Sequence, residues 1–245
     1  MKTIAEPALF TRTDRDGVTV LRFSRATVLP GADLGLIGQL WDFFEAQRAR
    51  PSKVLVLETP AELMKPGSLE AMWEDVDRTK SIATALALAR EENALHRFIQ
   101  EVRAVNAFVV CVLQGEIDLP FLGPALACDY RIAADDTVFT NRGLRHGLPV
   151  CGAVTWFLTH HLGPGKALEI LLDPGLVTAE KARELSLVNE VVPVADLERR
   201  ALERAAELAK LPATALVALK RSLVATTRPL HEYLDEECRI FERFV

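Results

Sequence analysis

The sequence predicts an α/β fold. Apolar runs at residues 53–57 (KVLVL) and 108–113 (FVVCVL) are short and uninterrupted, which is typical of strands that are buried on both faces of a sheet. Helical patterns separate the strands in the first half of the chain, and helices dominate its end. Strands separated by helices imply parallel pairing with right-handed crossovers.

The first half of the chain alternates between the two kinds of element. Residues 18–23 (VTVLRF) alternate after Asp16-Gly17 and predict a strand. Residues 34–48 predict a helix, because apolar side chains recur at helical spacing. The remaining predictions for this half are a strand at 53–57, a loop at 60–67, a helix at 81–102, and strands at 108–113 and 129–133.

The second half is mainly helical. Thr178 is the expected N-cap of one short helix, and Pro212 separates two longer amphipathic ones. The last helix carries one apolar stripe, formed by Leu230, Leu234, Cys238 and Phe241. The predicted elements are helices at 152–161, 165–172, 178–185, 196–211, 213–226 and 228–244, and a strand at 188–192.

Composition narrows the classes of function. The 245 residues are 49% hydrophobic and 26% charged, with a net charge of −5 and no obvious basic face, which disfavours nucleic acid as a partner. No apolar run approaches the roughly 20 residues of a membrane helix, and residues 1–10 do not form a signal peptide. We therefore expect a soluble, cytoplasmic protein that does not associate with membranes.

Four cysteines are present, Cys111, Cys128, Cys151 and Cys238. They form no CxxC pair and lie at no zinc-finger spacing from a histidine, so the sequence predicts no metal site. Buried free thiols in a reducing compartment are the expected state.

Residues 109–192 carry an ordered set of short motifs. They are Gly115, ALACDYRIAADDTVF at 125–139, Gly147, LTHHLG at 158–163 and TAEKARELSLVNEVVP at 178–193. Together they resemble the crotonase (enoyl-CoA hydratase/isomerase) family, and weaker matches such as Lys220-Arg221 extend the resemblance over nearly the whole chain. The resemblance implies a crotonase-like ββα spiral core at 1–190 and a helical C-terminal trimerisation region at 191–245. It also implies an acyl-CoA ligand or substrate, no further cofactor, and a homotrimer or dimer of trimers.

In this family two backbone N–H groups polarise the thioester carbonyl. By resemblance the first donor is Ser68, followed by Leu69 where the family has an acidic residue. The second donor falls on Pro120, which has no N–H, unless the loop shifts so that Phe121 donates. A packed loop with no catalytic role is the favoured interpretation of this segment.

The two glutamates that do acid–base work in the hydratases correspond to Gly123 and Gly143. Since glycine cannot transfer a proton, ordinary hydratase activity is not expected. Candidate replacements are Cys151 as a nucleophile and Glu116 and Asp118 as carboxylates. The structural alternatives are favoured for each: a core thiol for Cys151, and a solvated loop pair for Glu116 and Asp118.

The resemblance also places the coenzyme A contacts. The matching positions are Arg25, Thr27, Val28, Leu29, Gly67 and Leu69. The family often has a basic residue at the Thr27 position, so phosphate contacts are weakened unless Arg25 compensates. Three functions stay open: an acyl-CoA enzyme with altered catalytic residues, a non-catalytic acyl-CoA-binding or scaffold protein, and a structural partner subunit.

Overall fold

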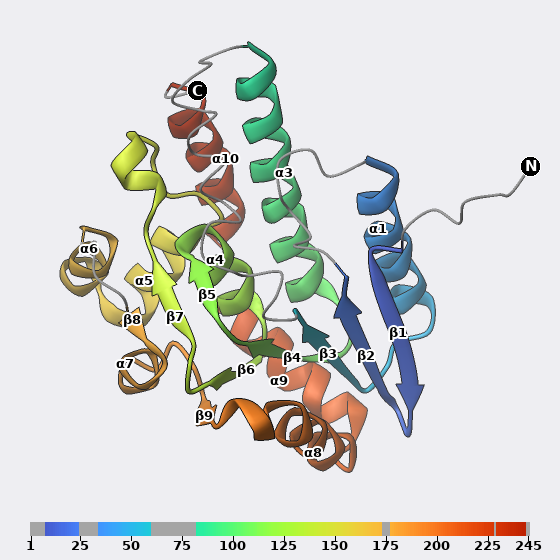
Figure 1. Cartoon of the computed structure of the whole chain (residues 1–245). Coiled ribbons are helices and arrows are strands. Elements are labelled where there is room, and N and C mark those ends of the chain that lie inside the picture. Colours follow the sequence, from blue (N-terminus) through green and yellow to red (C-terminus); the bar gives the residue numbers. More distant parts are fainter. Residues whose placement is uncertain (1–7, 25–33, 60–81, 173–176, 228, 244–245) are drawn as a thin grey trace, which may run out of the picture.

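The computed structural model describes residues 8–24, 34–59, 82–172, 177–227 and 229–243. Within these ranges the main sheet has six strands in the order β1-β2-β3-β4-β6-β9 (Figure 1). Only β1 runs antiparallel to its neighbour β2, and the other pairs are parallel as predicted. The strands are β1 (Phe10–Arg15), β2 (Val18–Phe23), β3 (Val54–Glu58), β4 (Phe108–Leu113), β6 (Tyr130–Ala134) and β9 (Glu190–Val192).

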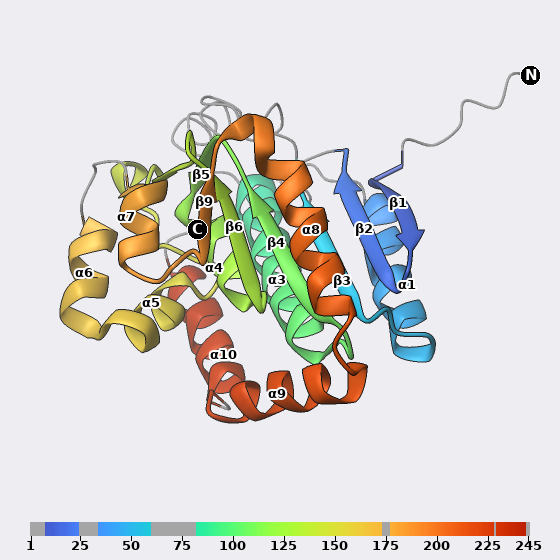
Figure 2. The same ribbon diagram turned by 90° about the horizontal axis from the view of Figure 1, so that it is seen from below.

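Alternating side chains bury both faces of this sheet. Val54 and Val56 of β3 face one way and join a cluster with helix α8 (Leu197–Ala209). Leu55 and Leu57 point the other way, into the core shared with α1 (Leu34–Ala49) and α3 (Ile82–Ala104). Figure 2 shows α8 and α3 on opposite sides of the central strands. The two-sided burial predicted from KVLVL and FVVCVL is confirmed, and part of the C-terminal region completes the core.

A smaller sheet and the other helices complete the described part of the fold. Its strands are β5 (Glu116–Asp118), β7 (Val138–Thr140) and β8 (Val177–Thr178), in the order β5-β7-β8. The remaining helices are α4 (Leu119–Ala127), α5 (Val154–Leu162), α6 (Pro164–Leu172), α7 (Ala179–Glu184), α9 (Ala213–Ala225) and α10 (Leu230–Phe241), with 3₁₀ turns η2 (Gly143–His146) and η3 (Val194–Asp196). The last helix, α10, returns to lie beside α3 (Figure 1).

The amino-terminal ends of β4 and β6 are joined by a buried lysine. Lys220 Nζ on α9 donates to Asp129 Oδ2 at 2.9 Å and to the carbonyl oxygens of Val102 and Ala107 at 2.7 and 3.1 Å. The same Asp129 oxygen accepts the Val109 N–H at 2.7 Å. Every donor of the ammonium group thus has an acceptor, which is the condition for burying a charge.

Most predicted elements are confirmed, including the Thr178 cap, whose hydroxyl accepts the Lys181 N–H at 3.2 Å. The sequence missed β1 because it is polar and almost wholly exposed, with no apolar alternation. It missed β5, β7 and β8 because strands of two or three residues are too short to show a period. The loop predicted at 60–67 lies outside the described residues.

Candidate functional site

An apolar cavity lies at the carboxyl ends of the parallel strands. Its volume is about 80 Å³, several times the space that one water molecule needs. Aromatic and aliphatic side chains from three strand ends and three helices line it: Phe23, Leu57, Leu113, Trp41, Phe98 and Phe121. Because ligands of open α/β sheets bind outside the carboxyl ends of the strands, we take this cavity as the candidate site.

Helix α4 begins at the cavity. Asp118 is its N-cap, and Pro120 is its second residue, a position at which a missing N–H and a fixed φ are tolerated. Phe121 follows and lines the cavity. The segment around Pro120, expected to be a packed loop, is therefore a short strand leading into a helix.

The other face of α4 packs directly on the turn before α5. A Cβ built on Gly123 would lie 1.7 Å from the carbonyl oxygen of Gly152 and 3.2 Å from the backbone nitrogen of Val154. A Cβ on Gly152 would lie 2.4 Å from the carbonyl oxygen of Pro120. Backbone therefore contacts backbone here, and no side chain fits at position 123 without moving the helix.

Glu116 and Asp118 are held by one partner. Arg142 donates through Nε to Glu116 Oε1 at 2.8 Å, with a second contact from Nη2, and its backbone N–H donates to Asp118 Oδ1 at 3.1 Å. Asp118 is only 2% exposed and also accepts the Leu119 N–H at 3.0 Å. The interpretation of these carboxylates as a solvated loop pair is wrong, because β5 draws both into the protein.

Gly143 begins the 3₁₀ turn η2 and is buried. It directly follows Arg142, so the second position assigned to a lost glutamate lies beside the residue that holds Glu116 and Asp118. Position 143 is therefore buried close to β5, on which Glu116 and Asp118 lie.

Cys151 does not line the cavity. It is buried in the turn that precedes α5, where Gly152 and Ala153 both adopt left-handed backbone conformations (φ 75° and 57°). Ala153 N–H donates to Glu237 Oε2 of α10 at 2.8 Å. Burial, followed by the negative charge of Glu237, raises the pKa of Tyr233 in the same environment.

Two other thiols, on β4 and just after α4, do line the cavity. They are Cys111 and Cys128, which the sequence treated only as core cysteines. A hydrogen bond with Cys111, followed by burial, raises the pKa of Cys128 well above its ordinary value. Both Cys111 and Cys238 are half-buried, so full burial holds only for Cys128 and Cys151.

The remaining predicted site residues lie outside the described part of the chain. They are the donor Ser68 and the proposed coenzyme A contacts Arg25, Thr27, Val28, Leu29, Gly67 and Leu69. Their roles stay predictions.

A cavity at the strand ends with a helix beginning at its edge is the arrangement in which α/β proteins bind small molecules. The chain belongs to the enoyl-CoA hydratase/isomerase family, whose model matches residues 16–245. A probable enoyl-CoA hydratase of Rhodobacter capsulatus is 35% identical over 117 residues, 47% of this chain and 46% of that protein. A probable mitochondrial enoyl-CoA hydratase of Dictyostelium discoideum is 32% identical over 142 residues, 57% of this chain and 48% of that protein. The chain thus spans about half the length of these curated relatives.

Solved structures confirm the predicted crotonase-like fold. An enoyl-CoA hydratase from Bacillus halodurans aligns with a TM-score of 0.80 at 17% identity, covering 97% of this chain and 95% of that one. An enoyl-CoA hydratase/isomerase from Cupriavidus metallidurans CH34 aligns with a TM-score of 0.72 at 23% identity, covering 96% and 86%. In the part of the chain that the structure describes, no helix is both long and apolar enough to cross a membrane.

Proposed function

We propose that this protein binds an acyl-CoA thioester with the acyl chain in the apolar cavity, and that it does not hydrate enoyl-CoA. The observation that carries the proposal is that the two faces of α4 have different surroundings. One face lines an apolar cavity at the position where α/β folds bind ligands, and the other is closed by backbone at Gly123. Coenzyme A enters as part of the ligand, and no further cofactor is needed.

The thioester carbonyl would lie at the start of α4. Phe121 is the third residue of the helix, so its N–H has no carbonyl partner within the helix, and the positive end of the helix dipole favours a partial negative charge there. Phe121 also lines the cavity, which supports it rather than Pro120 as one donor. Ser68 N–H is the second donor in this proposal.

Three arguments support the absence of ordinary hydration. The positions assigned to the catalytic glutamates are Gly123 and Gly143, which carry no side chain to transfer a proton. Nearby, Glu116 pairs with Arg142 and Asp118 caps α4, so both carboxylates already have structural partners. Cys151 lies in the turn behind α4 and not in the cavity wall.

The experiment is isothermal titration with crotonyl-CoA, acetyl-CoA and free CoA, followed by a hydration assay on the same samples. Ala125 lines the cavity, so Ala125→Leu places a larger apolar side chain in it. We expect Ala125→Leu to weaken crotonyl-CoA binding at least about tenfold, through lost acyl burial, while free CoA binding is unchanged. Ala104→Leu, at the exposed end of α3, is the matched control.

Each outcome has a distinct meaning. Hydration of crotonyl-CoA would overturn the assignment of Gly123 and Gly143, and turnover of another thioester would favour an enzyme that uses Cys151, Glu116 or Asp118. Absence of binding would favour a structural partner subunit.

Assembly and location complete the proposal. We propose a homotrimer, or a dimer of trimers, in the cytoplasm. Exposed leucines on two helices support self-association: Leu168 and Leu172 on α6, and Leu219 and Leu223 on α9, are each more than half exposed. Light scattering coupled to size exclusion measures the assembly directly, and a monomer would contradict it.

A further inference from the structure

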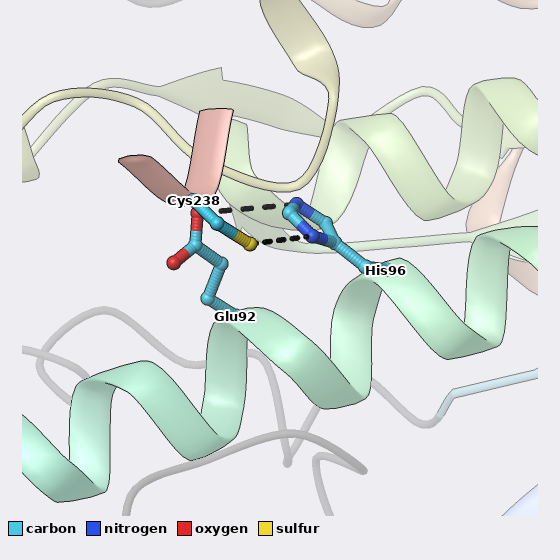
Figure 3. Close-up of side chains that lie close together, drawn as sticks. All are labelled: Glu92, His96 and Cys238. Atoms are coloured by element: carbon cyan, nitrogen blue, oxygen red, sulfur yellow. Dashed lines mark hydrogen bonds and ion pairs between the residues drawn. The ribbon is translucent and has the colours of Figure 1, made fainter. Parts of the chain in front are cut away.

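A buried polar cluster lies between α3 and α10, apart from the cavity. Glu92 and His96 are four residues apart on one face of α3, and Cys238 faces them from α10 (Figure 3). One ligand atom from each of the three residues lies within 4.8 Å of the other two. His96 and Cys238 are 142 positions apart in the chain, so no local spacing announces the cluster.

Glu92 is buried, and one of its carboxylate oxygens makes no hydrogen bond with the described residues. Its side chain is 2% exposed, and no hydrogen-bond partner for Oε1 lies in the described ranges. The His96 ring nitrogen Nε2 is 3.9 Å away. A buried carboxylate oxygen without a partner is costly, so either a proton or a metal ion is expected there.

The hydrogen bonds of Glu237 define which nitrogen of His96 can bind a metal. Glu237 accepts the Ala153 N–H at 2.8 Å and the Tyr233 O–H at 2.8 Å, as an ionised carboxylate does. It lies 2.7 Å from His96 Nε2, so Nε2 carries the proton that is donated to Glu237. When His96 is neutral, the lone pair is then on Nδ1, and a carboxylate that accepts a hydrogen bond from the other ring nitrogen is the usual support for a histidine that binds a metal.

The spacing between the two strongest donors fits zinc. His96 Nδ1 and Cys238 Sγ are 3.5 Å apart (Figure 3). Zinc bonds of roughly 2.0 Å to nitrogen and 2.3 Å to sulfur at a tetrahedral angle place these atoms roughly 3.5 Å apart. An ion could therefore replace the thiol proton without moving either side chain far.

We propose that Glu92, His96 and Cys238 form a binding site for one zinc ion, with a water molecule as the fourth ligand. The sulfur, nitrogen and oxygen donors suit zinc better than calcium or magnesium, which prefer oxygen alone. The ion joins α10 to α3. His96 contacts Glu237, and Glu237 accepts the Ala153 N–H, so the ion also supports the turn at 151–153. The Gly152 carbonyl of that turn packs on α4. The site therefore stabilises the position of α4, which lines the cavity.

The test uses full-length protein treated with EDTA and dialysed. Titration with Zn²⁺ should give one ion per chain with a dissociation constant below about 1 µM, and the melting temperature should rise by about 5 °C or more at saturation. Co²⁺ in its place should produce a thiolate-to-metal absorption band, which reports the Cys238 sulfur directly. Cys238→Ser should abolish that band and weaken Zn²⁺ binding about 100-fold, and Glu92→Gln should weaken it about tenfold.

Matched controls separate this site from surface binding. Cys111→Ser removes a half-buried thiol elsewhere in the core, and His160→Gln with His161→Gln removes two histidines at the end of α5. Both controls should keep the stoichiometry and the Co²⁺ band. Absence of tight 1:1 binding, or binding that survives Cys238→Ser, overturns the proposal and leaves a proton as the partner of Glu92, whose pKa burial raises to about 7.

Discussion

The two ends of the parallel strands are closed by different chemistry. At the amino ends, Lys220 bonds Asp129 and two backbone carbonyls, and Glu190 binds two arginines of α8. At the carboxyl ends, apolar side chains surround a cavity. Ionic contacts thus hold the described strands together at their amino ends, while an apolar space remains at their carboxyl ends. Changes at the amino ends should alter stability without altering binding.

The largest expected effect is at Gly123, where the cavity wall depends on backbone contact. In Gly123→Ala the new methyl group would overlap the Gly152 carbonyl oxygen, so α4 must move away from the turn before α5. We expect a loss of about 4 kcal/mol or more in the free energy of unfolding, measured by urea denaturation. Gly123→Glu should be at least as severe and should not restore hydration.

Gly38 on α1 provides the control, because nothing lies within 4 Å of a Cβ at that position. Gly38→Ala should stabilise the protein by about 0.5 to 1 kcal/mol, since alanine favours the helix. If Gly123→Ala were equally harmless, the turn at 151–153 would be able to yield, and a side chain at position 123 could point into a site.

The amino end of the sheet should be nearly as sensitive to the loss of one charge. Lys220→Met removes the donor to Asp129 and leaves that carboxylate in a largely buried place without its cation. We expect a loss of about 3 kcal/mol in the free energy of unfolding, with acyl-CoA affinity unchanged. The double variant Lys220→Met with Asp129→Asn should recover part of that loss, because no charge is then left unpaired.

The neighbouring Arg221 separates this effect from a general change in charge. Its side chain is exposed and donates to Asn106 Oδ1 at 2.8 Å, so Arg221→Met should cost less than about 0.5 kcal/mol. If the Lys220→Met protein were as stable as wild type, the Lys220–Asp129 pair would not stabilise the amino end of the sheet.

Much of the fold could be predicted because a short run of apolar residues indicates a buried strand. KVLVL and FVVCVL become β3 and β4, which are buried on both faces, since an uninterrupted apolar run fits only a covered strand. The segment FTRTDR becomes β1 without any apolar alternation, because its pairing with β2 rests on backbone hydrogen bonds and on one ring contact, between Phe10 and Phe23. The apolar pattern therefore predicts the long covered strands of the main sheet, and it misses exposed β1 and the strands of two or three residues.

The site was less predictable, since its features depend on contacts between distant residues. Gly123 is recognisable as a missing glutamate by resemblance, but its contact with Gly152 follows only from how α4 packs. Glu116 and Asp118 look like solvated loop residues until β5 places them beside Arg142. The approach of Cys238 to His96 needs α10 to return along α3, which no local pattern encodes.

The smallest of these effects depends on pH and tests the other charged contact at the amino ends. Burial opposes the ionisation of Glu190, but hydrogen bonds from Arg200, Arg204 and Tyr130 outweigh it and lower the pKa of Glu190 to about 2 from its ordinary 4.5. A lowered pKa contributes stability that is present above pH 4.5 and is lost as the pH falls toward 2. Because solvent screens these partly exposed groups, we expect a contribution of about 1 to 2 kcal/mol.

Glu190→Gln isolates this contribution from the other carboxylates. The difference in free energy of unfolding between wild type and Glu190→Gln should be constant from pH 7 to about pH 5, and roughly half of the Glu190 contribution should be gone at pH 3. Urea denaturation at each pH measures the difference. A difference that stays the same down to pH 3 would mean that the two arginines do not hold Glu190 ionised in solution. Acyl-CoA affinity at neutral pH should be the same in both proteins, because this contact lies at the end of the sheet away from the cavity.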